Sequence, residues 1–303
     1  MAVQSLLSYA LTVPDLEAGR RFYSIFGLEP EDRGNALAFR CDGRAQDQVL
    51  LVEGGKKRLN HLRFGSDEAG LTAIRARMLA HAAAEIDAPS NQFGGGLWLR
   101  DPDGHPINVR AERAQPWRSA AAPFVINTPG HTPRAGRGCP PRHGVRPVRL
   151  GHVLLQTPDP ARLCRFYTDI LGLNLTDSVP GLIAFMHLPQ GGDHHVVAVL
   201  KSDRPGFHHA SFEVDSPDEI GLGAQTVLAA GYRNGWGFGR HVLGSNFFHY
   251  LRDPWLSMAE YFCDIDQIPG DGSWRAEDHP AEDALYRWGP PVPEDFDRNF
   301  EPD

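Results

Sequence analysis

Hydrophobic and polar positions follow the same order twice along the 303-residue chain. The segments LSYALTVPDLEAGRRFYSIFGLEP (residues 7–30) and LGHVLLQTPDPARLCRFYTDILGLNL (residues 150–175) each give an apolar stretch, a Pro-Asp turn, an Arg-Phe-Tyr segment and a Gly-Leu step. The apolar stretches alternate with a period of about two, which is typical of strands, and the Pro-Asp turn is a helix start signal. The pattern predicts two copies of one strand–helix unit.

Two further pairs of segments extend the repeat. NHLRFGSDEAGL (60–71) matches HHASFEVDSPDEIGL (208–222), and LWLRDPDGHPINV (97–109) matches FHYLRDPWLSMAE (248–260). Within each half, a strand, a helix and several strands are followed by the same series again. We therefore predict an α+β fold of two tandem domains, each built from two βαβββ modules.

A stretch of different composition separates the two halves. Residues 113–149 hold seven arginines, seven prolines and no acidic residue, so they favour neither a regular helix nor a packed core. We predict an N-terminal domain (1–112), a linker (113–147), a C-terminal domain (148–264) and an acidic tail (265–303). The basic linker is expected to be a solvated strap, and the acidic tail is one surface for it to lie against.

Charge and cysteine usage narrow the class of protein. The net charge is −8, and the chain from Asp264 onward holds twelve acidic and three basic residues, so nucleic acid is not an expected partner. No apolar run approaches the roughly 20 residues of a membrane helix, and the N-terminus shows no leader pattern. The four cysteines stand far apart without a close pair, which favours a reducing cytoplasm: Cys41, Cys139, Cys164 and Cys263.

The tail also carries aromatic residues. Trp274, Tyr286 and Trp288 are too many for a purely disordered acidic segment. We expect them to anchor the tail on a neighbouring surface, within the chain or across a subunit contact.

Polar residues of the second half are the candidates for chemistry. His152 lies in LGHVLLQTPD, His209 lies in FHHASFEV, and a third series runs from His241 through Tyr250 to Glu260. Together with the repeats, these positions resemble the vicinal oxygen chelate superfamily, and within it the type I extradiol ring-cleavage dioxygenases, which include catechol 2,3-dioxygenase and 2,3-dihydroxybiphenyl 1,2-dioxygenase. The resemblance covers about residues 5–264.

The resemblance implies that His152, His209 and Glu260 are the metal ligands. Two neutral imidazoles and one carboxylate on one face of a ferrous ion leave the opposite positions open for substrate and dioxygen. Fe(II) is therefore the expected cofactor, and Mn(II) suits the same ligand types. In the first half, we matched these positions to Tyr9, His61 and Asn108, which lack the carboxylate and one imidazole. That half is expected to be non-catalytic.

The resemblance also assigns catalytic roles. His241 and Tyr250, nine residues apart and with Glu260 ten residues further on, match residues that hydrogen-bond the hydroxyls of the substrate. A histidine in GGDHHVVAVL matches the acid and base of the reaction. Counting back from the apolar strand selects His195, and His194 stays open as the alternative.

Further residues are expected at the substrate. Asn246, Trp255 and His187 are predicted to bind it, and Trp236 and Phe185 are additional pocket candidates with core positions as their alternative. In the family, the turn before the glutamate ligand commonly has the sequence Asp-Pro, any residue, Gly.

This chain has Leu256 at the position of that glycine. The change is expected to alter a turn near the site and the shape of the substrate pocket. His208 and His249, adjacent to assigned residues, would point away on a strand and are expected at the surface or behind the site.

The implied function is extradiol cleavage of a catechol-type aromatic diol with dioxygen, giving a ring-opened semialdehyde or keto acid, in a homo-oligomer. Two alternatives stay open. One is another metalloenzyme of the superfamily, such as a glyoxalase, an epimerase, or a hydroquinone-type or 4-hydroxyphenylpyruvate-type dioxygenase. The glyoxalase case requires four ligands shared between modules. The other alternative is a metal-free ligand-binding protein.

Overall fold

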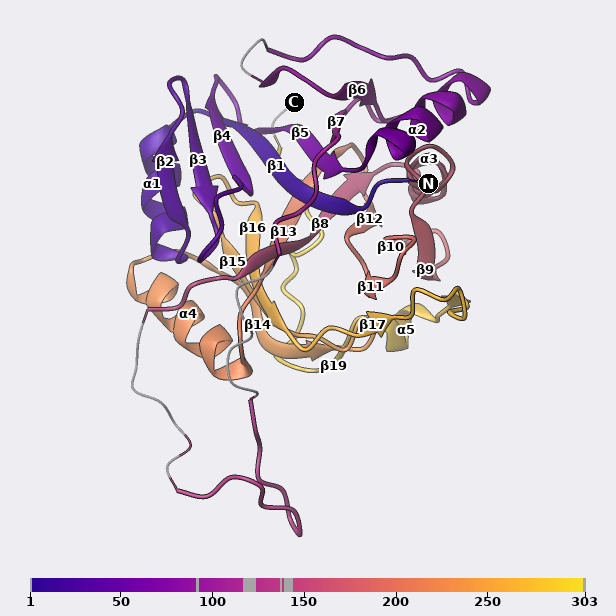
Figure 1. Ribbon diagram of the computed structural model, residues 1–303. Helices are drawn as coiled ribbons and strands as arrows, with labels where there is room; N and C mark the ends of the chain where they lie inside the picture. Colours follow the sequence, from indigo (N-terminus) through magenta and orange to yellow (C-terminus); the bar gives the residue numbers. More distant parts are fainter. Residues whose placement is uncertain (1, 91–92, 117–123, 137, 139–143, 302–303) are drawn as a thin grey trace.

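The described chain forms two large β-sheets, one from each half of the sequence, and one small two-stranded sheet (Figure 1). The structure is a computed structural model, which describes residues 2–90, 93–116, 124–136, 138 and 144–301. Helices cover the outer faces of the sheets. No helix in the described ranges has the length and apolar character to cross a membrane.

The first half builds a seven-stranded sheet in the order β2-β3-β4-β1-β5-β7-β6. Its elements are β1 (Ser5–Val13), α1 (Leu16–Ile25), β2 (Glu29–Asp32), β3 (Ala36–Arg40), β4 (Val49–Glu53), β5 (Arg58–Gly65), α2 (Glu68–Ala80), β6 (Leu97–Arg100) and β7 (Pro106–Arg110). The second module of this half consists of β5, α2, β6 and β7, so its described part lacks one strand of the predicted βαβββ order. A single bridge joins Glu85 to Leu99 there.

The second half builds the core of a ten-stranded sheet. Its elements are β8 (Arg149–Thr157), α3 (Pro160–Phe166), the π-helical turn η2 (Tyr167–Leu171), β9 (Asn174–Val179), β10 (Ile183–His187), β11 (Gly192–Asp193), β12 (Val197–Lys201), β13 (Gly206–Glu213), α4 (Pro217–Ala229), β14 (Asn234–His241), β15 (Phe247–Arg252) and β16 (Met258–Cys263). The central strands run in the order β12-β8-β13-β16-β15-β14. The predicted repeat of strand, helix and further strands is confirmed.

The Pro-Asp turns start helices in both halves. The carboxylate of Asp15 accepts a hydrogen bond from Ala18 N, and that of Asp159 accepts one from Arg162 N. Each side chain satisfies one of the backbone donors that a helix leaves free at its start. The first helix of each half therefore follows its first strand at the same offset.

Two strands of the acidic tail join the second sheet, and a third forms a separate two-stranded sheet with β11. Its elements are β17 (Gln267–Ile268), β18 (Glu277–Asp278), α5 (Ala281–Ala284) and β19 (Tyr286–Trp288). β18 pairs with β9 and β19 pairs with β14, so short strands of the tail cover β9 and β14 and form both edges of the sheet. Its aromatic residues anchor it within the chain: Trp274 donates to Thr176 O, and Trp288 packs on Phe238 and Phe247.

One hydrophobic core runs through both halves. The rings of Phe26 and Tyr261 stack with centroids 3.9 Å apart, and the Tyr261 hydroxyl donates to Phe26 O. Tyr9 stacks on Phe207 in the same way at 5.1 Å. Contacts of this kind add to the burial of large aromatic surfaces, so the two sheets are fixed against each other.

The described part of the linker contacts the first half and not the acidic tail. Arg146 pairs with Glu29 at 2.7 Å and approaches Asp42 at 3.7 Å. Residues 124–136 form an arm that stands away from the two sheets (Figure 1). The expected contact between linker and tail is therefore not found among the described residues.

The turn before β16 keeps its shape despite the missing glycine. Leu256 adopts a positive φ of 72°, and the matching residue of the first half, Gly104, has a φ of 92°. A left-handed conformation costs a residue with a side chain about 1–2 kcal/mol. Leu256 therefore accepts backbone strain where the repeat uses glycine, and the turn is conserved between the halves.

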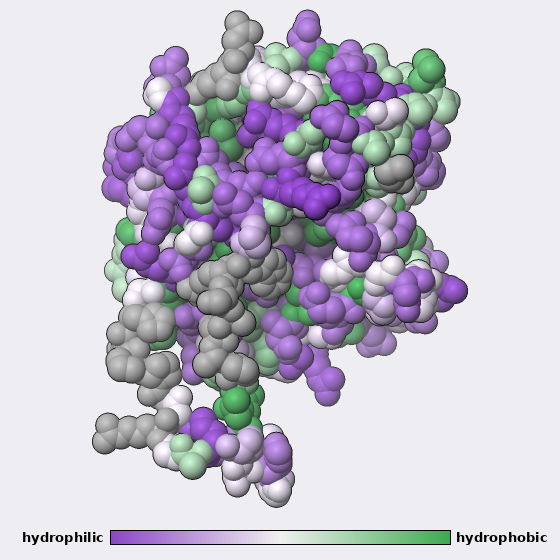
Figure 2. All heavy atoms as spheres, in the orientation of Figure 1, coloured by the Kyte–Doolittle hydropathy of each residue, from purple (hydrophilic) through white to green (hydrophobic). Residues whose placement is uncertain are grey.

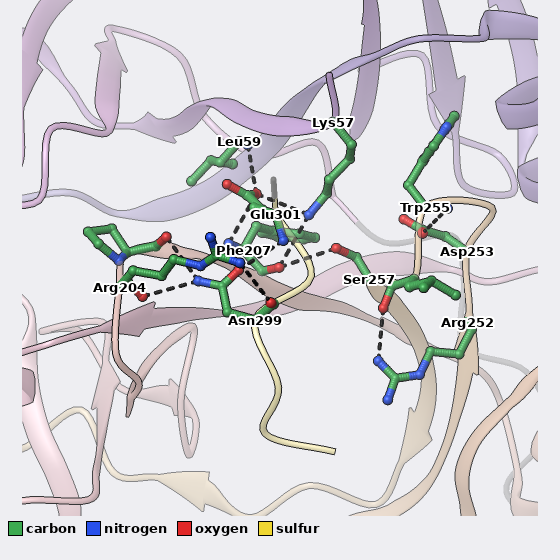
Figure 3. A network of polar contacts seen from close by, with 12 residues as sticks. Lys57, Leu59, Arg204, Phe207, Arg252, Asp253, Trp255, Ser257, Asn299 and Glu301 are labelled. Carbon is green, nitrogen blue, oxygen red and sulfur yellow. Dashed lines mark hydrogen bonds and ion pairs between the residues drawn. The ribbon is translucent and has the colours of Figure 1, made fainter. Parts of the chain in front are cut away.

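The end of the tail is held between the two halves by buried polar contacts (Figure 3). Glu301 Oε1 accepts hydrogen bonds from Leu59 N at 3.0 Å and Phe207 N at 3.2 Å, and pairs with Lys57 Nζ at 3.0 Å. Lys57 is 4% exposed and Glu301 is 9% exposed. A buried ion pair of this kind adds little stability compared with a hydrophobic pair in the same place. Removing one partner, however, leaves an uncompensated buried charge.

Glu301→Ala should therefore lower the free energy of unfolding by about 3 kcal/mol, because it removes the carboxylate that pairs directly with the buried Lys57 ammonium. Urea denaturation measures the change. Glu282→Ala, at an exposed glutamate of the same tail, is the control and should stay within about 0.5 kcal/mol of the parent. Equal midpoints for both variants would contradict the role of this contact.

Candidate metal centre and its cavity

Three neighbouring strands bring the predicted ligands together. His152 on β8 and Glu260 on β16 both lie opposite Ser211 of β13, and His209 precedes Ser211 by two residues. Residues directly opposite or two apart share a face of a sheet, so the side chains of all four point the same way. Ser211 is small and lies between the larger ligand side chains.

The ligand atoms converge in a buried site. One atom each of His152, His209 and Glu260 lies within 4.8 Å of the others, and all three residues are buried. Glu260 Oε2 is 3.2 Å from His152 Nε2 and 3.5 Å from His209 Nε2. The structure thus places the three predicted residues in one cluster.

The proton arrangement at His209 follows from its partners. His208 Nε2 donates to the carbonyl of Phe296 at 2.6 Å, and the Nδ1 atoms of His208 and His209 are 2.7 Å apart. Burial lowers the pKa of both histidines, which keeps them neutral. His208 Nδ1 therefore carries no proton and accepts a hydrogen bond from His209 Nδ1–H. A neutral imidazole with its proton on Nδ1 has no proton on Nε2, so the Nε2 atom of His209 is bare.

This arrangement fits a divalent metal ion. The bare His209 Nε2 and the Glu260 carboxylate both offer electron pairs, so their 3.5 Å approach is not a hydrogen bond. Two buried electron-pair donors that face each other are stabilised by a cation between them. Two imidazoles and a carboxylate form the facial set typical of non-heme Fe(II) enzymes.

The matching positions of the first half require a correction. Strand pairing aligns Val153 with Tyr9, because each pairs with a valine of the neighbouring parallel strand, Val197 and Val49. The residue equivalent to His152 is therefore Ser8. Counting from the Pro-Asp turn gives the same register, so the expected match to Tyr9 is wrong by one residue.

The corrected set of the first half is Ser8, His61 and Asn108. It still contains one imidazole and no carboxylate, and the Asn108 side-chain oxygen accepts from the guanidinium groups of Arg63 and Arg110. Burial lowers the pKa of His61 to about 3. These residues do not form a metal-binding set among the described part of the chain.

A cavity of about 390 Å³ opens in front of the three ligands. Strands from both sides of the sheet line it, so the sheet curves around it, and the tail closes it. Its walls are mainly apolar, with Leu154, Val179, Leu182, Ile183, Phe185, Leu200 and Leu243 from the sheet and its loops, and Ala281, Ala284, Leu285, Val292, Pro293, Glu294, Phe296 and Asp297 from the tail.

Three predicted catalytic or substrate residues also line this cavity. Tyr250 lies with its hydroxyl 2.9 Å from His241 Nε2, and His241 Nδ1 donates to Leu285 O in the tail. Asn246 Nδ2 is 3.5 Å from Glu260 Oε1. Burial raises the pKa of Tyr250 and lowers the pKa of His241, so a protonated phenol donates to a neutral imidazole.

His195 and His194 occupy different places. The His195 ring lines the cavity with its centroid 4.1 Å from that of His152, and burial lowers its pKa. His194 lies behind it and pairs with Asp177 at 2.9 Å. Of the two open candidates, the structure puts His195 at the metal ligands.

Two predicted substrate residues lie away from the cavity. Trp255 packs against α1, with its ring next to Gly19, because the turn that contains it faces the first half. His187 is buried and bonds through Nδ1 to the Thr176 hydroxyl. Neither of them lines the cavity described above, so the structure gives no support to either as a substrate contact.

The contacts of the remaining candidates show which of them reach the cavity. Trp236 stacks behind Tyr250 at 5.9 Å and donates to Pro290 O, so it supports the cavity from behind. Phe185 does line the cavity. His249 bonds to Asn234 and points away from the site, as expected for a neighbour of Tyr250 on a strand.

Sequence reasoning missed the contribution of the tail. Leu285 and Phe296 supply both cavity wall and carbonyl acceptors for site histidines. The sequence carried a signal, because an acidic segment rich in aromatic and apolar residues is not typical of a solvated tail. It did not indicate which surface the segment covers.

Comparison with known proteins agrees with this geometry. The sequence profile of the Glyoxalase/Bleomycin resistance protein/Dioxygenase superfamily matches residues 149–261. The chain is 42% identical over 304 residues to Metapyrocatechase 2 of Cupriavidus necator, covering 99% of this chain and 93% of the relative. The chain belongs to the extradiol ring-cleavage dioxygenases. It is also 25% identical to the iron-dependent extradiol dioxygenase of Rhodococcus jostii, over 95% of this chain and 97% of that one.

The fold of this extradiol dioxygenase matches a solved structure. The Mn(II)-bound glyoxalase from Novosphingobium aromaticivorans superposes with a TM-score of 0.77 at 25% identity, covering 97% of this chain and 93% of that chain. Relatives of this chain among the extradiol dioxygenases are named as iron-dependent and as manganese-dependent. Extradiol dioxygenases related to this chain are therefore metal-dependent, with Fe or Mn.

The metal site makes a direct prediction. His152→Ala, His209→Ala and Glu260→Ala should each lose the metal, of which the parent dioxygenase should hold about one ion per chain, because each change removes one of three ligands. Metal analysis of purified protein measures the content. His61→Ala and Asn108→Ala, at the equivalent positions of the first half, are the controls and should keep it. Equal metal content in all five variants would refute the assignment.

Proposed function

We propose that the dioxygenase cleaves the ring of a catechol-type diol beside its two hydroxyls, using dioxygen and a ferrous ion held by His152, His209 and Glu260. The observation that carries the proposal is the convergence of this ligand set with His195, His241 and Tyr250 in one cavity. The product is a ring-opened semialdehyde or keto acid. Mn(II) is the alternative ion, because the same ligand types accept it.

The bound ion would supply open coordination positions for the diol and dioxygen and would lower the pKa of the bound hydroxyl. His241 is neutral and anchored through Nδ1 on the tail carbonyl of Leu285, so its Nε2 has room for a proton. Tyr250 lies within hydrogen-bond reach of that nitrogen. We propose that this pair orients the diol and receives the hydroxyl proton.

His195 is proposed as the acid and base for the later proton transfers. Its ring is against His152 on the metal side of the cavity, and its neutral state leaves it free to take up and return a proton. A positioned group of this kind typically contributes about 10²–10⁴-fold to a rate. A glyoxalase activity is not favoured, because it requires a fourth ligand and gives no role to the His241–Tyr250 pair.

The cavity walls favour a neutral substrate with an apolar substituent. The wall is mainly aliphatic and aromatic, and its charged members from the tail are the carboxylates of Glu294 and Asp297. No lysine or arginine lines the described cavity. A carboxylate on the substrate would lose its hydration here without gaining a counter-charge, which is costly.

We therefore expect kcat/KM for 4-methylcatechol to exceed that for 3,4-dihydroxybenzoate by more than about tenfold, since 1.4 kcal/mol of discrimination gives a factor of ten. Oxygen uptake and product absorbance measure both rates. Glu294→Gln should narrow the gap, because it removes one like charge from the wall. Equal use of the acidic and neutral catechols by the parent would rule out this preference.

We further propose that the dioxygenase is a homo-oligomer. The arm at residues 124–136 exposes three consecutive apolar side chains, Phe124, Val125 and Ile126, at 48%, 41% and 59%. Figure 2 shows a hydrophobic group on this arm, away from the main body. Exposed apolar side chains that adjoin one another are typical of association surfaces.

Light scattering should give a mass above one chain for the parent and a smaller mass for the double variant Phe124→Ser, Ile126→Ser. A monomeric parent would refute the proposal. The cytoplasmic location expected from the sequence stays a prediction.

A further inference from the structure

His194 is a buried histidine outside the cavity, and the proposed chemistry gives it no role. It is 1% exposed. Its Nε2 lies 2.9 Å from Asp177 Oδ2 on β9, and its Nδ1 lies 3.1 Å from His195 Nδ1. It therefore connects a buried carboxylate to the histidine that lines the cavity.

The carboxylate of Asp177 is held as an acceptor. Burial by itself would raise the pKa of Asp177, but hydrogen bonds from His194 and from Glu277 N in the tail outweigh it and lower the pKa. The Glu277 N–H donates to Asp177 Oδ1 at 3.0 Å, so the second oxygen remains for His194. An ionised carboxylate accepts hydrogen bonds and donates none.

The hydrogen bonds of Asp177 and His194 bear on the proton of His195. Because Asp177 only accepts, His194 donates to it through Nε2. In the neutral form of His194, the Nδ1 atom is then bare and accepts from His195 Nδ1–H at 3.1 Å, which leaves His195 Nε2 bare. The Phe296–His208–His209 contacts follow the same order, with the outer histidine accepting from the inner one.

The surroundings hold His194 in this orientation. Trp274 from the tail meets its ring edge-on at 6.2 Å, and Phe185 meets it at 5.7 Å. The Thr176 hydroxyl donates to the backbone carbonyl of His194 at 2.7 Å. Rotation of the ring would lose the Asp177 and His195 bonds together.

We propose that Asp177 and His194 are positioning residues that hold His195 in the Nδ1–H tautomer with a bare Nε2 toward the cavity. His195 then begins the reaction as a base and becomes an acid only after it has taken a proton. This role for His195 rests on the proposed dioxygenase function, whereas the tautomer itself does not. Partners behind a functional histidine fix its tautomer in metal sites in the same way.

Asp177→Asn reverses the order of donors. Because Glu277 N–H requires the remaining oxygen, the amide presents its NH₂ group to His194 Nε2, so His194 becomes a donor through Nδ1 and His195 moves its proton to Nε2. The loss in kcat should be about 10–100-fold, with KM and metal content unchanged. In a His195→Gln background the same change should cost nothing further.

Two variants of His194 separate positioning from packing. His194→Asn keeps an oxygen near the place of Nδ1 and should retain most of the rate, because the amide oxygen still accepts from His195 Nδ1–H. His194→Phe keeps the ring shape without an acceptor and should fall as far as Asp177→Asn. Equal rates for the two variants would overturn the proposal.

The tautomer is measured without turnover. Long-range ¹H–¹⁵N spectra of histidine-labelled protein, loaded with diamagnetic Zn(II), should show His195 with its proton on Nδ1, and His195→Gln identifies the signal. In Asp177→Asn the proton should appear on Nε2. A parent signal with the proton on Nε2 would overturn this inference. If the parent shows the Nδ1 signal but does not cleave the ring, only the proposed function is overturned.

Discussion

The site depends on buried electron pairs that face one another. The Glu260 carboxylate lies 3.5 Å from the bare Nε2 of His209, whose proton is committed on its other side to His208, and His152 Nε2 lies 3.2 Å from the same carboxylate. Such a cluster is unfavourable in a buried place unless a cation joins it. The β8-β13-β16 order of the sheet produces the cluster, because it brings three residues far apart in sequence onto one face.

The C-terminal tail connects the fold to this chemistry. Its strands cover both edges of the sheet, and its carbonyls at Leu285 and Phe296 accept hydrogen bonds from His241 and His208. At Glu301 the same tail ends between the two halves. The tail therefore determines the cavity wall, the orientation of site histidines and part of the domain contact, although its sequence is not repeated in the first half.

The repeated modules and the ligands could be predicted from the sequence because both depend on local order. Strand alternation and the Pro-Asp helix starts fix the modules, and the resemblance places His152, His209 and Glu260 on separate strands. The shift from Ser8 to Tyr9 in the matched set arose because both residues occupy the same apolar strand, where only pairing partners fix the register.

Contacts between distant segments could not be predicted. Trp255 follows the Asp-Pro turn, but the side of the sheet that it faces is set by packing on Gly19 of the other half. His187 is two residues from Phe185 on β10, but a register shift lies between Phe185 and Met186, and Thr176 holds His187 outside the cavity. The His194–Asp177 pair likewise joins residues 17 positions apart. They lie close together because the chain reverses direction after β9.

Identification of the product of catechol by NMR tests the account most directly. The proposed function predicts cleavage of the carbon–carbon bond beside the diol, so the parent should give 2-hydroxymuconic semialdehyde, a product with one aldehyde and one carboxylate. Cleavage between the two hydroxyl-bearing carbons, which gives a dicarboxylate, or no consumption of catechol by metal-loaded enzyme, would contradict it.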